Sequence, residues 1–228
     1  MIFAAGFGTR MRSLTKEQPK PLIKVAGRSL IDRSLDLADD ANIPLKVVNT
    51  HYLGHLLSEH LSHRDDVVIS HEEGYARETG GGLKYALPLL GSEPVFTMNP
   101  DAIWTGPNPL TTLGDAWKPE HMQGLLLLVP VSRAMGYEKT GDFTLDATGR
   151  VSRYTGSGQP FVYSSVQILC TGGLSHFDDD LFSLNLLWNR MIEDGSLFGV
   201  VHPGGWVDVG SPEGIILAED LLAGGADV

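Results

Sequence analysis

Apolar and polar positions along the chain predict strands and helices in regular alternation. In the first half, short apolar runs predict buried strands, and segments with apolar residues spaced three or four apart predict amphipathic helices. The predicted strands are 2–4, 45–49, 67–70 and 94–98, and the predicted helices are 30–38, 52–61 and 82–90. Strands that alternate with helices are typical of βαβ units, in which helices cover a largely parallel sheet.

The second half of the chain is richer in strands. Two short alternating runs flank the turn sequence Asp-Ala-Thr-Gly and predict a β-hairpin. The predicted strands are 125–131, 142–145, 151–154, 161–169, 197–201 and 206–209, and the predicted helices are 184–193 and 212–222. We therefore expect an α/β fold, a Rossmann-like three-layer α/β/α sandwich with a mixed, mostly parallel sheet and a β-hairpin excursion. Its length suits one domain, residues 1–228.

The stretch after the first predicted strand carries the strongest chemical pattern. It reads A-A-G-F-G-T-R from Ala4 to Arg10, and Lys20 follows between two prolines. Gly6 and Gly8 let backbone N–H groups approach an anion closely, and the two cations supply positive charge. The pattern differs from a dinucleotide-binding fingerprint and from a Walker loop. It favours a binding loop for a nucleoside triphosphate, although for the two glycines alone an ordinary turn is the alternative.

Two aspartates far apart in the sequence follow predicted strands. Asp101 comes directly after V-F-T-M-N-P, and Asp208 lies in G-W-V-D-V-G, where Val207 and Val209 face the opposite way. Ligands of open α/β sheets bind at the carboxyl ends of the strands, so both carboxylates can meet the glycine loop there. One or two carboxylates with phosphate oxygens suit Mg²⁺. The alternatives are a turn cap for Asp101 and an exposed loop position for Asp208.

Three consecutive glycines precede another predicted helix. Residues 78–83 read E-T-G-G-G-L. Glycines at a helix start expose backbone N–H groups at the positive end of the helix dipole, where an anion or a polar ligand can bind. An ordinary turn is the alternative, but a turn does not require three glycines. We therefore expect this segment to line the same cleft.

The run from Ala4 to Leu30 resembles the signature of the sugar nucleotidyltransferases, the nucleotide-sugar pyrophosphorylases. That signature is roughly A-A-G-x-G-T-R-(M/L)-x-P-L-T, then P-K-P-L and V-x-G-x-P-L-I; Ser13 and Ser29 stand here in place of proline. The family element W-x-D-(V/I)-G-(T/S)-P is matched around Asp208, and the resemblance covers essentially the whole chain. It implies a GT-A-like fold and an Mg²⁺-dependent enzyme that joins a nucleoside triphosphate to a sugar-1-phosphate and releases pyrophosphate.

The resemblance also implies roles for the candidate residues. Arg10 is expected to hold the β- and γ-phosphates, and Lys20 to contact the α-phosphate or the sugar phosphate. Asp101 and Asp208 are the expected metal ligands, and these four are the expected catalytic residues. The expected nucleotide-binding residues are Ala4, Ala5, Gly6, Gly8, Thr9, Arg10, Lys20, Gly80 and Gly81. The expected sugar-binding residues are Glu78, Thr79 and Asp142.

Within the family, the E-T-G-G-G and G-D-F segments most resemble the N-acetylmuramate α-1-phosphate uridylyltransferases of peptidoglycan recycling in the cell wall, which use UTP. Two alternatives stay open. The chain could transfer a thymidylyl or guanylyl group to glucose- or mannose-1-phosphate. It could also be a catalytically silent nucleotide-binding subunit that regulates a partner. Such subunits typically lose the metal carboxylate or the phosphate-binding arginine, and the chain has both.

The composition restricts partners and compartment. The 17 basic and 28 acidic residues give a formal net charge of −11, which argues against a nucleic-acid surface. No apolar segment approaches about 20 residues, so we expect no membrane span. One cysteine, Cys170, and no visible signal peptide predict a cytoplasmic protein. We expect a monomer whose partners are the two small-molecule substrates.

Overall fold

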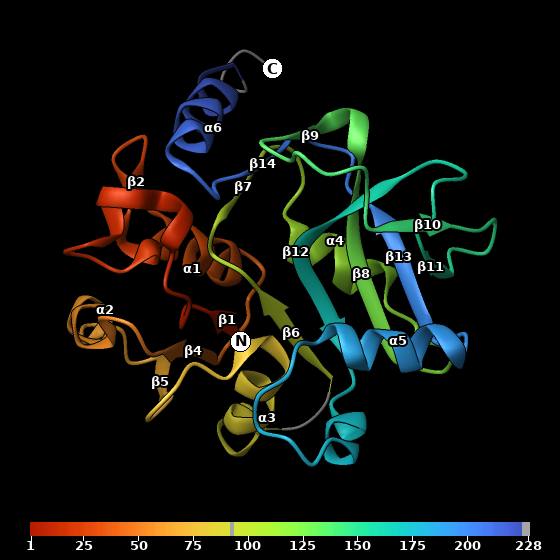
Figure 1. The fold of residues 1–228 in the computed structure, drawn as a ribbon, viewed down its shortest axis with the longest axis horizontal. Helices are drawn as coiled ribbons and strands as arrows, with labels where there is room; N and C mark the ends of the chain where they lie inside the picture. Colours follow the sequence, from red (N-terminus) through yellow and green to blue (C-terminus); the bar gives the residue numbers. More distant parts are fainter. Residues whose placement is uncertain (92–93, 225–228) are drawn as a thin grey trace.

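A mixed β-sheet of nine strands forms the centre of the molecule in the computed structural model (Figure 1). The structure describes residues 1–91 and 94–224. The strands of this sheet are β1 Ile2–Phe3, β4 Lys46–Thr50, β5 Val67–His71, β6 Val95–Met98, β8 Gly124–Pro130, β10 Phe143–Leu145, β11 Val151–Arg153, β12 Phe161–Leu169 and β13 Leu197–Val201. Neighbouring strands follow the order β11-β10-β12-β6-β1-β4-β5, and β8 joins β12 to β13.

Parallel and antiparallel pairings divide the sheet into two parts. Strands β6, β1, β4 and β5 pair in parallel, as expected for βαβ units. The long strand β12 pairs antiparallel with β6, with β8 and with β10. The hairpin β10–β11 is present where the turn sequence predicted it. The mixed sheet predicted from the sequence is therefore confirmed, with its parallel pairings confined to β6-β1-β4-β5 and to β8-β13.

Helices cover both faces of the sheet. They are α1 Leu30–Asp40, α2 Gly54–Leu61, α3 Glu78–Leu90, α4 Pro109–Ala116, α5 Asn185–Glu193 and α6 Pro212–Gly224. Helices α3 and α5 contribute to one apolar cluster, and α1, α2 and α4 to another. The side chain of Ser29 caps α1 by accepting a hydrogen bond from the Asp32 N–H at 3.1 Å. The expected three-layer arrangement is confirmed.

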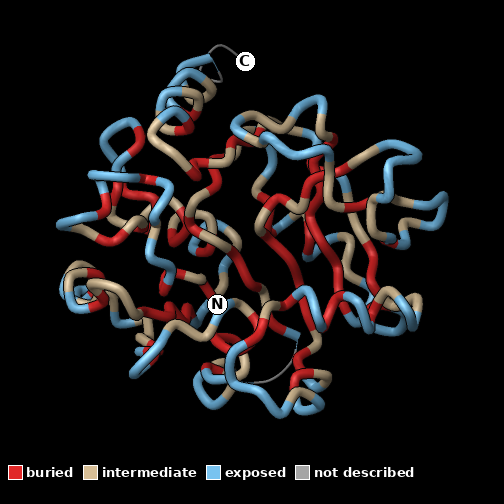
Figure 2. Tube along the Cα trace, viewed as in Figure 1, coloured by how far each residue is buried: buried red, intermediate tan, exposed pale blue. Residues whose placement is uncertain are grey.

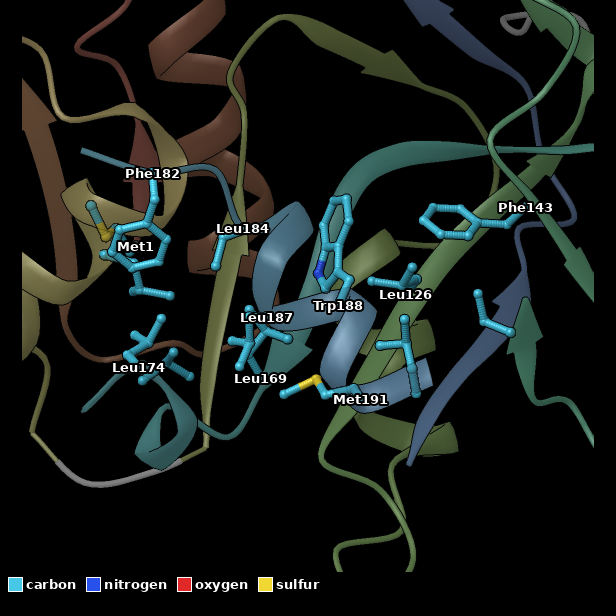
Figure 3. Packing of buried hydrophobic residues seen from close by; sticks show 14 of the residues in the cluster. Met1, Leu126, Phe143, Leu169, Leu174, Phe182, Leu184, Leu187, Trp188 and Met191 are labelled. Carbon is cyan, nitrogen blue, oxygen red and sulfur yellow. The ribbon is translucent and has the colours of Figure 1, made fainter. Parts of the chain in front are cut away.

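The core lies on both sides of the central strands, because successive side chains of a strand point to opposite faces. In β8, Leu126 and Leu128 belong to the cluster under α3 and α5, whereas Leu125 and Leu127 belong to the cluster on the other face. Buried residues accordingly follow the strands through the middle of the molecule (Figure 2). Figure 3 shows the α5 side, where Trp188 packs edge-on against Phe143 with the ring centres 5.8 Å apart.

A second sheet brings the two predicted metal ligands together. It consists of β7 Ala102–Trp104, β14 Trp206–Asp208 and β9 Ala134–Met135, in the order β7-β14-β9. Helix α6 packs on it through a separate apolar cluster that includes Ile103, Val207 and Ala218. Since β14 runs antiparallel to β7, with Asp208 opposite Ala102, the residue at 208 lies next to the one at 101.

Several features of the fold differ from the sequence prediction. Helix α3 begins at Glu78, four residues before the predicted start at Gly82, so the three glycines lie inside its first turns. Strand β7 and helix α4 were not predicted at all.

Within the part of the chain that the structure describes, no helix combines the length and apolar character needed to cross a membrane.

Candidate active site

A tight loop after β1 forms one wall of the site. Gly8 has a φ of +62°, a conformation that glycine adopts without strain, and the chain then enters a 3₁₀ helix at Thr9–Thr15. The Thr15 hydroxyl donates to the Gly8 carbonyl at 3.1 Å. A Cβ at position 8 would lie 2.9 Å from the Thr15 Cγ2 and 3.0 Å from the Lys20 Cβ. The glycine therefore lets the loop close over the start of the lysine side chain.

Lys20 lies at the base of this loop and faces the first predicted metal ligand. Its Nζ donates to the Asp101 Oδ2 at 2.6 Å, and the two side chains are only 12% and 21% exposed. Pro19 and Pro21 flank the lysine at the start of a short 3₁₀ helix and restrict its backbone. A charge-assisted hydrogen bond of this length in a partly buried setting is strong.

Asp208 lies beside Asp101 at the end of β14. The Val209 N–H donates to the Asp101 carbonyl oxygen at 2.7 Å, which fixes the two backbones against each other. Burial raises the pKa of the Asp208 carboxyl above its ordinary value, and the negative charge of Asp101 raises this pKa further. A cation placed here would offset the effect of the Asp101 charge on Asp208.

Arg10 is the fourth member of the charged cluster and lies next to Asp208. Its Nη1 lies 3.6 Å from the Asp208 Oδ2, and its side chain is 68% exposed and so free to turn toward a ligand. Gly210 makes room for this approach, because a Cβ there would overlap the Arg10 guanidinium and lie 2.9 Å from the Asp208 Oδ2. All four predicted catalytic residues therefore meet in one place.

The donor set of this cluster fits a divalent metal ion that is shared with a substrate. Within residues 1–91 and 94–224, no group of three or more His, Cys, Asp or Glu side chains is placed to hold a metal alone. Asp101 and Asp208 supply two carboxylates, and Mg²⁺ commonly takes one or two carboxylates, with phosphate oxygens and water as its other ligands. The two carboxylates are therefore suited to Mg²⁺ that arrives with a nucleotide.

A cavity of about 580 Å³ opens beside the cluster. Its volume is within the range of small-molecule and cofactor sites. Ten of the predicted site residues line it: Ala4, Ala5, Gly6, Gly8, Thr9, Arg10, Lys20, Glu78, Thr79 and Asp101. Asp208 lies behind Asp101 and Arg10, and is not itself part of the lining. Four chain segments distant in sequence thus contribute to one site.

Residues 1–168 match the family of the MobA-like NTP transferase domain. The chain belongs to this family. It is 42% identical to the N-acetylmuramate alpha-1-phosphate uridylyltransferase of Caulobacter vibrioides, over 98% of this chain and 96% of the relative. A protein of the same name from Neisseria meningitidis is 30% identical over 92% of each chain.

Solved structures confirm the fold of this NTP transferase. Yersinia pseudotuberculosis HddC, in a complex with GMP-PN, has a TM-score of 0.77 at 20% identity and covers 96% of both chains. The inositol-1-phosphate CTP transferase of T. maritima has a TM-score of 0.77 at 15% identity, over 99% of this chain and 95% of the other. The sugar nucleotidyltransferase family identified from the sequence is confirmed.

The three glycines of α3 were expected to line the ligand cleft, but their surroundings differ from this. The N–H groups of Gly80 and Gly81 both donate to the Phe182 carbonyl oxygen, at 2.9 and 3.0 Å, and neither glycine lines the cavity. A Cβ at Gly80 would collide with the Phe182 ring, and one at Gly81 would overlap the Asp180 carbonyl oxygen. The expectation that these N–H groups stand exposed for a ligand is therefore wrong; they hold the segment before α5.

The two residues before these glycines remain in the cavity wall. Glu78 is exposed at the start of α3 and has a φ of +58°, which is unusual for a residue with a side chain. Thr79 accepts a hydrogen bond from the Leu184 N–H at 3.0 Å through its hydroxyl, so it also ties α3 to the start of α5. Both are placed where a sugar or a base can reach them.

Two buried polar residues of the site were not predicted. Asn49, at the end of β4, accepts a hydrogen bond from the Ala4 N–H at 2.7 Å and donates to the Glu72 Oε1 at 2.6 Å. The other Glu72 oxygen accepts from the Arg77 N–H at 2.7 Å. This chain of hydrogen bonds fixes the start of the glycine loop. The signal in the sequence was a polar residue at the carboxyl end of one apolar strand, Asn49, and another just past the end of the next, Glu72.

Asp142 is placed in a second, smaller cavity of about 260 Å³. One of its oxygens accepts from the Tyr137 hydroxyl at 3.0 Å, and the other accepts from the Tyr163 N–H at 3.0 Å. Burial, together with the charge of this carboxylate, raises the pKa of Tyr137. Because both oxygens already have partners within the protein, Asp142 shapes this cavity more than it offers a free acceptor.

Proposed function

We propose that this chain transfers the uridylyl group of UTP to N-acetylmuramate α-1-phosphate, giving the UDP-sugar and pyrophosphate in peptidoglycan recycling. The observation that carries the proposal is the meeting of Lys20, Asp101, Asp208 and Arg10 beside a cavity of nucleotide size. The choice of base and sugar is supported by the two relatives that bear this enzyme name.

The reaction requires no nucleophile from the protein. A phosphate oxygen of the sugar phosphate attacks the α-phosphorus of UTP, the new P–O bond forms, and the bond to the β-phosphate oxygen breaks as pyrophosphate leaves. In such a reaction catalysis depends on positioning and on neutralising the charge of the phosphates. The mobile Arg10 suits the β- and γ-phosphates, and the more enclosed Lys20 suits a phosphate held deeper in the cavity.

In this scheme Lys20 has two alternative partners. Its Nζ pairs with Asp101 in the structure, and a substrate phosphate would take over the ammonium group. The Asp101 carboxylate would then be available, with Asp208, to hold Mg²⁺. When bound there, Mg²⁺ would supply positive charge that neutralises the phosphate oxygens and positions them for the reaction.

We further propose that the chain acts as one domain and as a monomer in the cytoplasm. A single cysteine in 228 residues supports a reducing compartment. A net charge of −11 supports small-molecule substrates in preference to nucleic acid, because a nucleic-acid surface needs a basic face. The positive groups of the site are concentrated at the phosphate positions instead.

A second candidate keeps the chemistry and changes the substrates. Mannose-1-phosphate guanyltransferase beta-B of Xenopus laevis is 25% identical over 93% of this chain, which spans 61% of that relative. The test is a panel of UTP, dTTP, GTP and CTP against several sugar-1-phosphates, followed by pyrophosphate release. We expect the highest kcat/KM with UTP and N-acetylmuramate α-1-phosphate. A preference for GTP with mannose-1-phosphate would reject this choice in favour of the second candidate.

A further inference from the structure

The second cavity adjoins the nucleotide cavity and has charged residues in its own lining. The two share Phe3, Thr79 and Asn99 in their linings, so a ligand that begins beside Asp101 can continue into the smaller space. Strands β10, β11 and β12 and the start of α5 enclose it. Among the described residues that line either cavity, the arginines are Arg10 in the larger one and Arg153 in the smaller one.

Arg153 is held by neutral groups. Its Nε and Nη2 donate to the Asn189 Oδ1 at 3.1 and 2.7 Å, and Nη2 also donates to the Asn185 carbonyl oxygen at 3.2 Å. The guanidinium carbon lies 4.8 Å from the centre of the Phe143 ring and 5.8 Å from that of Trp188. These contacts fix the plane of the guanidinium, and all of them are with uncharged groups.

No carboxylate of residues 1–91 or 94–224 forms an ion pair with this arginine. Asp142 lines the same cavity, but its two oxygens accept from Tyr137 and from the Tyr163 N–H. Burial lowers the pKa of Arg153, and the charge of Asp142 in the same cavity acts on this pKa in the opposite direction without forming an ion pair. Arg153 therefore has a carboxylate in the same cavity but no ion-pair partner among the described residues.

We propose that Arg153 binds a carboxylate carried by the sugar ring of the acceptor and thereby selects acidic sugar phosphates. A planar guanidinium with one edge fixed by Asn189 can present its remaining N–H groups to a carboxylate. The inference rests on the proposed function and deepens it: N-acetylmuramate carries a carboxylate on its lactyl ether, and N-acetylglucosamine lacks that group. Asn189 acts as a positioning residue, since its side-chain oxygen accepts from the guanidinium and it lines neither cavity.

The test compares two acceptors that differ only in the lactyl group. The kcat/KM of pyrophosphate release from UTP is measured with N-acetylmuramate α-1-phosphate and with N-acetylglucosamine α-1-phosphate, for the wild type, Arg153→Met and Arg153→Lys. Binding of both sugar phosphates is measured by calorimetry. Arg190→Gln is the matched control, because this exposed arginine also contacts an aromatic ring, that of Phe177, but lies outside both cavities.

We expect Arg153→Met to lose roughly 10- to 100-fold in kcat/KM for the acid-bearing sugar, mainly through KM, because the carboxylate is left unpaired. The same variant should change less than about 3-fold with N-acetylglucosamine α-1-phosphate, which does not present the group. Arg153→Lys should fall between the two, since it keeps the charge and loses the planar fork. Asn189→Ala should weaken binding of the acidic sugar in the same direction as Arg153→Lys.

The failures of the two proposals are distinguishable. Equal losses for both sugars in Arg153→Met, with the control unchanged, overturn the role of Arg153 and leave the proposed function standing. If the wild type shows no transfer from UTP but calorimetry still shows an Arg153-dependent preference for the acidic sugar phosphate, the proposed function fails and the inference holds. If the wild type binds neither sugar phosphate, both are overturned.

Discussion

The Nζ of Lys20 lies 2.6 Å from Oδ2 of Asp101, so the cation expected to meet a phosphate and the carboxylate expected to meet a metal neutralise each other. Asp208 is the neighbouring carboxylate in the site, and its pKa is raised by its burial and by the charge of Asp101. The site thus holds two carboxylates close together, and the positive charges of Lys20 and Arg10 offset their negative charge. Under the proposed function, we expect a bound metal–nucleotide pair to replace these internal partners.

The first prediction concerns Asp101→Asn. The amide cannot supply the negative charge that a divalent ion requires, so we expect kcat to fall by about 10³-fold or more, which abolishes measurable turnover. Thermal unfolding should show a folded protein, because the side chain is partly exposed and of unchanged size. Asp115→Asn, on the exposed side of α4, is the matched control and should keep wild-type kcat. Full Mg²⁺-dependent activity of Asp101→Asn would show that the metal assignment is wrong.

The second prediction concerns the space that Gly210 leaves for Arg10. A Cβ at 210 overlaps the guanidinium, which is the flexible end of a long side chain, so Gly210→Ala should displace Arg10 with little loss of stability. We expect KM for UTP to rise by about 10-fold, because the cation is moved from the phosphate position. Gly114→Ala is the control, since its Cβ would only approach the Phe96 ring at 3.9 Å. An unchanged KM in Gly210→Ala would exclude Arg10 from the nucleotide site.

The third prediction concerns Gly81. Its new Cβ would overlap the Asp180 carbonyl oxygen, which is backbone and cannot turn away. We expect Gly81→Ala to lower the free energy of unfolding by about 2 kcal/mol, because either α3 or the segment at 180–182 must shift. Urea unfolding measures this, with Gly114→Ala again as the control. A stability equal to wild type would show that the glycine is not needed for this packing.

Much of the fold was predictable because its signals are local. Strand β12 has the predicted bounds, 161–169, since β-branched and aromatic residues at both ends of this segment favour a strand. Helix α4 also carries a local signal that the prediction missed: Asn108 precedes Pro109 and accepts from the Leu110 N–H at 2.9 Å as an N-cap. Strand β7 has only three residues, and its pairing with β14 joins positions about a hundred residues apart.

The candidate site was predictable where a motif carries the chemistry, and not where distant packing decides. Lys20 and Asp101 are 81 residues apart and lie in one cleft, as their separate motifs implied, but the ion pair between them was not predicted. The start of α3 was misplaced because glycine is a poor helix former, and here it is required by contact with Phe182, about 100 residues away. The proposed role of Arg153 depends on Asn189, 36 residues further along, and no local pattern connects the two.

The fourth prediction concerns acid stability at the edge of the sheet, where Asp66 accepts from Arg64 at 2.8 and 2.9 Å and from the buried Lys46 at 2.6 Å. Arg64, and then Lys46, hold the pKa of the Asp66 carboxyl well below its usual range. A folded-state pKa below the unfolded value gives stability that is present above the unfolded pKa and is lost as pH falls toward the folded one. Asp66 therefore stabilises the protein at neutral pH and progressively less below about pH 4.

We accordingly expect Asp66→Asn to lower the free energy of unfolding by about 1 kcal/mol at pH 7, a modest value because the side chain is 34% exposed. The difference from wild type should be constant from pH 7 to pH 5 and should shrink at pH 3. Urea unfolding at these three pH values measures it. Asp65→Asn is the control, since this exposed neighbour has no ion pair among the described residues. A difference that grows toward pH 3 would mean that Asp66 is not held in its ionised form by these cations.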